Sequence, residues 1–294
     1  GAAGAAACGP RPARQDGWVL ADVIGYLICP VCGSAVALTG GAVRCERGHS
    51  FDVARQGYVN MLTGSKPPGT ADTPAMVAAR AAFLGAGHYA PLAGRLAELC
   101  RGAAVVADAG AGTGHYLARA LDDRAVGIAL DVSKHALKRA ARAHPRIGAV
   151  VADVWRRLPV RDRCVDVLLN VFAPRNAAEF ARVLRPGGTL IVVTPTDGHL
   201  RPLVERLGLL SVDEEKERRL EAALGGRFTR TGHEIIELDL ALGHDAVEAV
   251  VAMGPSAWHT DPETLAGRIR GLPGTVRVAA SFRVTTWRVT ELTP

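Results

Sequence analysis

Short apolar runs alternate with helix-length amphipathic segments from residue 103 onward. Five of these runs predict strands: 104–108, 126–131, 149–152, 165–171 and 189–194. Strands that alternate with helices along a chain are typical of a doubly wound sheet whose strands run parallel. Two later runs, 234–240 and 276–290, predict closing strands. The pattern therefore predicts an α/β fold.

Helical spacing of apolar residues predicts two helices before the first of these strands. They occupy 76–84 and 89–100, where Leu92, Leu96 and Leu99 follow the helical period. Residues 63–74 contain Gly, Ser and Pro, which indicates a linker ahead of them. Four more helices are predicted later in the chain: 199–207, 212–224, 244–253 and 262–272.

The N-terminal part follows a different pattern, in which cysteines interrupt a predicted hairpin. A turn at Gly40 separates two pairs of candidate metal ligands, Cys29 with Cys32 and Cys45 with His49. Twelve residues separate the second ligand from the third, and three separate the third from the fourth. Two knuckles at this spacing can present three thiolates and an imidazole to one tetrahedral zinc ion.

Zinc is expected to be structural in this module. A segment of about thirty residues cannot bury enough apolar area to fold alone, and bound zinc contributes on the order of 10 kcal/mol in small modules. Four protein ligands also leave no open position for a reactive water. Free cysteines in a hairpin are the alternative interpretation.

The net charge indicates the kind of partner, and the cysteines indicate the redox state of the compartment. The 294 residues carry a formal charge of +6, which favours an anionic partner such as RNA if the basic side chains cluster. Cys8, Cys100 and Cys164 lie outside the zinc pattern without a pairing logic, which indicates thiols in a reducing compartment. No run is long and apolar enough to span a bilayer. We therefore expect a cytoplasmic protein with no membrane segment.

A glycine turn follows the first predicted strand directly. Asp108 ends the strand, and Gly110, Gly112 and Gly114 lead into a helix, so that bare backbone can approach a ligand. A dinucleotide-binding turn would need another glycine where this chain has His115. The tighter turn predicts a cofactor without a pyrophosphate.

Carboxylates at the ends of the next two strands fit an adenosine. Asp131 ends the second strand, where it can accept both ribose hydroxyls, although a helix cap is the alternative role. Asp153, Val154 and Trp155 end the third strand and place a carboxylate and an apolar surface near the adenine. Together with the glycine turn and residues 184–190, these features resemble the class I S-adenosylmethionine-dependent methyltransferases. That resemblance implies a Rossmann-like, mostly parallel seven-stranded sheet.

The end of the fourth strand is the expected place for the acceptor. Asn170, Phe172 and Pro174 resemble the four-residue target loop of enzymes that methylate nitrogens of bases, but depart from its Asn/Asp-Pro-Pro-aromatic form. Phe172 could instead be a core residue. Asp72 and His88 are candidate bases, and the sequence chooses neither. The predicted cofactor-binding residues are Asp108, Gly110, Gly112, Gly114, His115, Asp131, Asp153, Val154 and Asn170.

The whole chain from Tyr26 onward is similar to the RlmA-type 23S rRNA (guanine-N1)-methyltransferases, in the branch that confers resistance to tylosin and related macrolides. The residues that carry the similarity are 29–32, 44–60, 76–80, 87–89, 170–176 and 253–259. The resemblance implies methylation of N1 of one guanine in a hairpin loop of 23S rRNA, which would obstruct macrolides such as tylosin or mycinamicin. It also implies a homodimer, a zinc domain that recognises RNA, and S-adenosylmethionine as the methyl donor.

Basic and aromatic residues of the zinc module are the predicted RNA contacts, because loop bases that flip out are recognised by stacking and by cationic side chains. They are Arg44, Arg47, Arg55, Tyr58 and Lys66. For a second set of arginines, phosphate contact and simple solvation remain equally open: Arg156, Arg157, Arg161 and Arg163.

We therefore divide the chain into four parts: a disordered tail at 1–21, a zinc-binding RNA-recognition domain at 22–62, a linker with helices that cover the cofactor site at 63–102, and a methyltransferase domain at 103–294. One alternative is a methyltransferase for a small molecule such as an antibiotic or quinone, which would leave the zinc module unexplained. Another is a non-catalytic zinc-ribbon RNA-binding protein, which the intact glycine turn and Asp131 argue against.

Overall fold

The computed structural model describes residues 19–64, 71–209, 216–254 and 261–290, with the side chains of 216, 217 and 262 left out. The predicted tail lies almost wholly outside these residues. Among the described helices none is long and apolar enough to cross a membrane.

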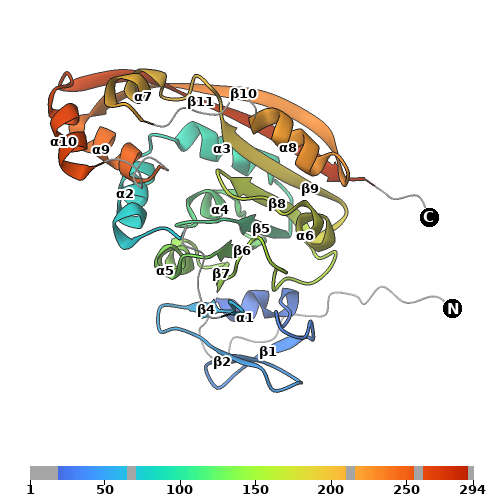
Figure 1. Ribbon diagram of the computed structural model, residues 1–294. Helices are drawn as coiled ribbons and strands as arrows, with labels where there is room; N and C mark the ends of the chain where they lie inside the picture. Colours follow the sequence, from blue (N-terminus) through green and yellow to red (C-terminus); the bar gives the residue numbers. More distant parts are fainter. Residues whose placement is uncertain (1–18, 65–70, 210–215, 255–260, 291–294) are drawn as a thin grey trace.

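One large sheet forms the body of the molecule (Figure 1). Its strand order is β10-β11-β9-β8-β5-β6-β7-β4. The strands are β4 (Tyr58–Asn60), β5 (Val105–Ala109), β6 (Val126–Asp131), β7 (Ile147–Val151), β8 (Val165–Val171), β9 (Leu184–Pro195), β10 (Phe228–Gly243) and β11 (Thr275–Val289). From β9 to β4 every neighbouring pair is parallel, and β11 runs antiparallel to both β9 and β10. The predicted α/β fold with a mostly parallel sheet is confirmed.

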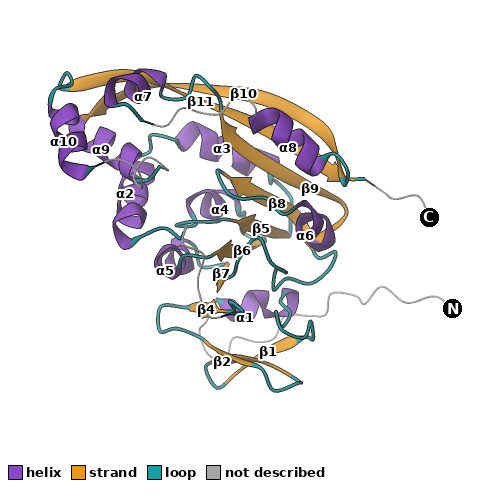
Figure 2. Cartoon of the chain, viewed as in Figure 1, coloured by secondary structure: helices purple, strands orange, loops and turns teal. Residues whose placement is uncertain are grey.

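Helices cover both faces of the sheet (Figure 2). The first face carries α2 (Pro74–Gly85), α3 (Ala90–Leu99), α4 (His115–Ala120), α5 (Lys134–Ala143), α7 (Arg201–Leu207), α9 (His244–Ala252) and α10 (Pro262–Arg270). The second face carries α1 (Leu20–Val23), the 3-10 helix η1 (Ile24–Tyr26), α6 (Ala177–Val183) and α8 (Lys216–Leu224). The strands between them are buried on both faces, which is why they read as continuous apolar runs.

The part that holds the candidate zinc ligands is a small separate sheet. It contains β1 (Val36–Thr39), β2 (Ala42–Cys45) and β3 (Ser50–Asp52) in antiparallel order. Figure 2 shows it at the bottom of the molecule, at the opposite end from the long strands β10 and β11.

The predicted boundary of the zinc domain at residue 62 differs from the observed architecture. Tyr58–Asn60 forms β4, which pairs in parallel with β7, so the large sheet has eight strands and not seven. Helix α1 also packs on β7, because Gly148 lets Val23 approach: a Cβ at Gly148 would lie 2.0 Å from Val23 Cγ2. Both ends of the predicted zinc domain therefore belong to the main core.

Two strands are longer than their apolar patterns predicted. β10 begins at Phe228 and pairs with β11 along its length, from Phe228 opposite Val289 to Gly243 opposite Thr275. Residues 231–239 of β10 alternate between exposed and half-buried positions, so few apolar residues mark this part of the strand in the sequence. β9 begins at Leu184, five residues before the strand predicted at 189–194.

Candidate functional site

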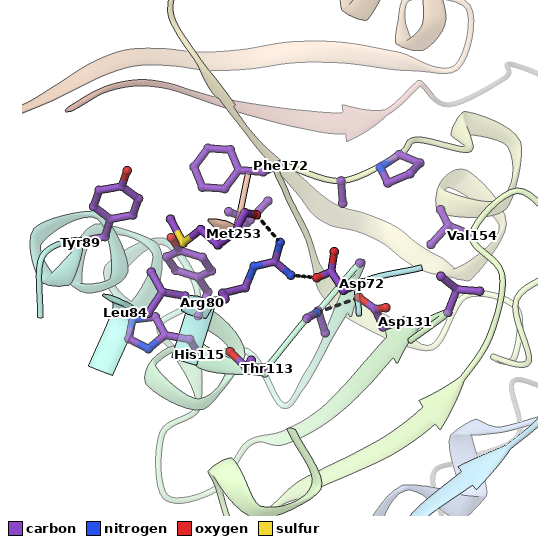
Figure 3. Close-up of a pocket in the computed structure, with 18 of the residues that line it drawn as sticks. Asp72, Arg80, Leu84, Tyr89, Thr113, His115, Asp131, Val154, Phe172 and Met253 are labelled. Atoms are coloured by element: carbon purple, nitrogen blue, oxygen red, sulfur yellow. Dashed lines mark hydrogen bonds and ion pairs between the residues drawn. The ribbon is translucent and has the colours of Figure 1, made fainter. Parts of the chain in front are cut away.

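A cavity of about 250 Å³ opens at the carboxyl ends of β5, β6 and β8 (Figure 3). The glycine turn after β5 and the loop after β8 form one wall. Asp131, Asp153, Val154 and Trp155 continue this wall from the ends of β6 and β7. The carboxyl ends of parallel strands are where α/β sheets bind ligands, and this cavity follows that rule.

The glycine turn requires glycine at two positions. Gly110 has φ +89°, and a Cβ there would lie 2.2 Å from the Cβ of Ala173 in the loop after β8. Gly114 has φ +75°, and a Cβ there would lie 3.0 Å from Ala140 on α5. Only a residue without a side chain allows both close approaches. The turn is therefore packed tightly between two neighbouring segments and presents its backbone to the cavity.

Asp108 lies behind the turn and is not part of the cavity wall. Its side chain is buried, and its Oδ1 has no hydrogen-bond partner in the described structure. Burial raises the pKa of Asp108 to about 8, and the negative charge of Asp131 adds to the rise. A cationic ligand next to the turn would stabilise the ionised form. S-adenosylmethionine, whose sulfonium is positive, fits this unpartnered carboxyl group.

Asp131 lines the cavity and is not the cap of the following helix. Its Oδ2 accepts a hydrogen bond from the Gly112 N–H (2.9 Å) and its Oδ1 accepts one from the Ser133 N–H (2.8 Å). The cap of α5 is Ser133, whose hydroxyl accepts from the Ala136 N–H. Burial raises the pKa of Asp131, and the two N–H donors oppose this rise. The carboxylate keeps acceptor capacity for the hydroxyls of a ribose.

The segment after β7 forms the end of the cavity. Asp153 Oδ1 accepts a hydrogen bond from the Trp155 N–H (3.0 Å), which fixes the turn. Val154 is buried, whereas Trp155 is 64% exposed. A carboxylate next to apolar side chains suits an adenine ring, and the contact of these residues with the adenine stays a prediction.

The loop after β8 places two of its three predicted residues at the cavity. Phe172 and Pro174 line it. Phe172 is 43% exposed and has φ +52°, so it is not a core residue, and its strained backbone is typical of functional sites. Its ring contacts those of Phe282 and Tyr116, with centroids 5.6 and 6.4 Å apart. The loop thus presents an aromatic face to the cavity.

Asn170 differs from its predicted place. It is fully buried and is not part of the cavity wall. Its amide donates to the Ala109 carbonyl (2.9 Å) and to the Pro174 carbonyl (2.8 Å). The side chain therefore ties the loop after β8 to the end of β5 and positions Phe172 and Pro174. Direct contact of Asn170 with the cofactor or the base stays a prediction.

The opposite wall comes partly from the helices that the sequence predicted to cover the cofactor site, but its individual residues were not among the predicted site residues. It is formed by Arg80, Leu84, Tyr89, Tyr116 and Met253. The Arg80 guanidinium donates to the Asp72 carboxylate and to the Met253 carbonyl, and so links three distant segments (Figure 3). For Arg80 and Tyr89 the only signal was their place in the motifs 76–80 and 87–89.

The two candidate bases, Asp72 and His88, differ in their position relative to the cavity. Asp72 lines the cavity, but its carboxylate is paired with Arg80. His88 is not part of the cavity wall, and its ring packs on that of Phe83, with centroids 4.6 Å apart. His115 does line the cavity, and its buried Nε2 has no partner in the described structure. Burial lowers the pKa of His115, and Arg119 adds to this effect.

The four candidate zinc ligands converge as predicted. Their ligand atoms lie within 4.8 Å of one another. His49 Nδ1 is 3.3 Å from Cys45 Sγ and 3.5 Å from Cys29 Sγ, and the sulfurs of Cys32 and Cys45 are 3.7 Å apart. Zinc–sulfur bonds of about 2.3 Å in a tetrahedron place two sulfurs about 3.7 Å apart. The cluster therefore has the donor set and the size for a structural zinc ion.

The predicted RNA contacts have mixed surroundings. Arg44, Arg47 and Arg55 are exposed, as an RNA contact requires. Tyr58 is half-buried on β4 and packs against the main core, so packing already accounts for it. Lys66 lies outside the described residues.

The pKa of Asp108 leads to a stability prediction. Folding raises this pKa from about 3.8 to about 8, so the native state favours the protonated form. Stability of the cofactor-free protein should therefore fall as pH rises through this window, because the carboxyl ionises in the unfolded chain while it stays protonated in the native one. Asp108→Asn should remove this dependence, so that its melting temperature exceeds that of the parent most clearly above pH 8. Thermal unfolding between pH 5 and 8.5 measures the effect, and a difference that is constant with pH would contradict it.

Two protein families match parts of the chain. Residues 27–65 match the zinc-ribbon family described as RlmA, N-terminal. Residues 106–188 match the family described as a methyltransferase domain. The first match covers the cysteine cluster, and the second covers the glycine turn, Asp131 and Asp153.

Relatives extend this similarity over most of the chain. A Streptomyces fradiae protein named 23S rRNA (guanine(748)-N(1))-methyltransferase is 53% identical over 275 residues, which cover 91% of this chain and 98% of that protein. A Micromonospora griseorubida protein is 50% identical over 291 residues, with the same two coverages. A Bacillus subtilis protein is 34% identical over 249 residues, which cover 78% of this chain and 86% of that protein. The latter two are named, provisionally, as 23S rRNA (guanine-N(1)-)-methyltransferases.

Proposed function

The chain belongs to the family of 23S rRNA (guanine-N1)-methyltransferases, and we propose that it transfers the methyl group of S-adenosylmethionine to N1 of a guanine in a hairpin loop of 23S rRNA. The observation that carries the proposal is that one chain contains both the zinc ribbon and the methyltransferase domain. Its similarity to the Streptomyces fradiae relative covers 98% of that protein. A methyltransferase for a small molecule would have no use for the zinc ribbon.

Residues of one wall would hold the cofactor. Asp131 would accept the ribose hydroxyls, and Asp153 with Val154 would contact the adenine. The backbone of the glycine turn would face the methionine part, with the charge of Asp108 behind it. When bound, S-adenosylmethionine supplies an activated methyl group, so the protein has to position the acceptor and exclude water.

The loop after β8 would position the acceptor. Phe172 offers an aromatic face at the cavity on which a flipped guanine can stack. Asn170 holds this loop through the carbonyls of Ala109 and Pro174, so the face is preorganised. The loop would hold N1 of the guanine at the cavity, and the proton of N1 would be released to solvent when that nitrogen is methylated.

The test is incubation of the protein with labelled S-adenosylmethionine and deproteinised 23S rRNA, followed by nucleoside mass spectrometry. We expect 1-methylguanosine in the hairpin fragment that contains position 748, the guanine named for the Streptomyces fradiae relative. Expression in a susceptible host should then raise the tolerated concentration of tylosin or mycinamicin. Binding of the cofactor with methylation of neither free RNA nor ribosomal particles would contradict the proposal.

A homodimer is part of the same proposal. β10 forms one edge of the large sheet and, within the described residues, pairs only with β11. Ile235 on this strand is 44% exposed. Unpaired strand edges are templates for association with another chain. Sedimentation equilibrium of the full chain would measure the mass of the assembly, and a monomer at micromolar concentration would contradict this part. Because the proposed substrate is rRNA, we propose that the protein acts in the cytoplasm.

A further inference from the structure

The most exposed large apolar side chain in the described structure lies at the mouth of the cofactor cavity. Trp155 is 64% exposed, and Val31, in the first zinc knuckle, is 57% exposed. Trp155 is followed by Arg156 and Arg157, both of which are also exposed. An exposed indole beside two guanidinium groups has the composition of a surface that binds single-stranded nucleic acid by stacking and charge.

The backbone around Trp155 is held rigidly. The N–H of Trp155 donates to Asp153 Oδ1 (3.0 Å), and the Asn176 amide donates to the Val154 carbonyl (3.1 Å). Three residues after Trp155, the Leu158 N–H donates to Glu179 Oε2 (2.7 Å). A solvent-exposed ring on a fixed backbone loses little freedom when a base stacks on it.

The same segment connects the zinc-binding part to the large sheet. Arg157 lies over the zinc knuckle, since its guanidinium would be 3.2 Å from a Cβ at Gly33. Arg156 donates to the Thr63 carbonyl (3.1 Å) at the exit of the zinc-binding part. Just beyond, the Ile28 N–H donates to the Pro159 carbonyl (3.1 Å). The segment therefore lies next to both the zinc ribbon and the cavity, where an RNA strand that reaches from one to the other can contact it.

We propose that Trp155, Arg156 and Arg157 form an RNA-binding surface, on which a base next to the target guanine stacks on Trp155 and its phosphates contact the two arginines. The inference rests on the proposed function and adds the path of the substrate to it. A protein partner is disfavoured, because two exposed arginines follow the ring along the chain; Arg156 Nε also lies 3.7 Å from the Asp153 carboxylate. Trp155 also lines the cavity, so a cover for the adenine of the cofactor is the competing role.

Binding without cofactor separates these two roles. A labelled hairpin transcribed around position 748 of 23S rRNA is titrated with the parent, Trp155→Ala and Trp155→Tyr, and fluorescence anisotropy gives Kd. We expect about a tenfold or greater loss of affinity for Trp155→Ala and near-parent affinity for Trp155→Tyr, because tyrosine can still stack. If Trp155 covers the adenine, Trp155→Ala binds the hairpin as the parent does and is weakened only towards S-adenosylmethionine. That result would overturn the proposal.

The arginines have their own readout. The double variant Arg156→Ala/Arg157→Ala should lower the slope of log Kd against log salt by about 1.4 to 1.8, which corresponds to two lost phosphate contacts. Arg277→Ala is the matched control, because this arginine is also exposed but lies on β11, outside the proposed surface. An unchanged slope in the double variant would overturn the role of the arginines. If the parent binds the hairpin but forms 1-methylguanosine in neither free 23S rRNA nor ribosomal particles, the proposed function fails while the surface stands. If the parent does not bind the hairpin, the surface fails.

Discussion

Cys45→Ser is expected to release zinc, unfold the zinc ribbon and reduce methylation of 23S rRNA by at least about a hundredfold. Besides the ligand Cys45, the sheet of β1, β2 and β3 contributes Ala42 and Val43 to the buried apolar side chains. Val36, Leu38 and Phe51 are partly buried. So small a core cannot hold the ribbon without the metal, which contributes on the order of 10 kcal/mol in comparable modules.

Binding of S-adenosylmethionine should survive this substitution. The flanking elements α1 and β4 pack on the main sheet and do not depend on the ribbon. Metal content by mass spectrometry, cofactor affinity by calorimetry and RNA methylation are measured together. Cys164→Ser is the control, because this half-buried cysteine is not a member of the metal-binding cluster. A Cys45→Ser protein that retains one zinc and full RNA methylation would show that the metal is dispensable.

Gly110→Ala is expected to lower activity by at least about thirtyfold, through displacement of the loop after β8. The new Cβ would lie 2.2 Å from that of Ala173, and the backbone has φ +89°, which alanine adopts only with strain. Strain and overpacking together cost about 2 to 3 kcal/mol or more. Both the cofactor turn and the position of Phe172 should be disturbed, so kcat and the affinity for S-adenosylmethionine are measured.

A second substitution separates the two causes. Gly110→Ala/Ala173→Gly removes the contact between the side chains but keeps the strained φ, so it should regain part of the lost activity. Gly94→Ala, in α3, is the matched control, because its Cβ would meet nothing within 4 Å. In a helix this change should stabilise the fold by up to about 1 kcal/mol. If the double variant is no better than Gly110→Ala, the contact with Ala173 is not the cause.

Local patterns were sufficient for the features whose members lie close together in the sequence. The apolar runs identified β5 to β9 because strands buried on both faces contain little else. The spacing of Cys29, Cys32, Cys45 and His49 predicted one cluster, since a knuckle fixes the geometry of its ligands within a few residues. The glycine turn was readable for the same reason.

Features made by distant segments were decided only by the tertiary structure. Nothing around Tyr58 showed that β4 would pair with β7 and extend the large sheet. The wall that Arg80 forms with Met253 joins positions 173 residues apart. From the sequence, Asn170 could line the cavity or be buried beneath it. In the structure it is buried, and its hydrogen bonds to the carbonyls of Ala109 and Pro174 hold the loop after β8. Spacing within a few residues determines local geometry, whereas the neighbours of a side chain depend on how the whole chain packs.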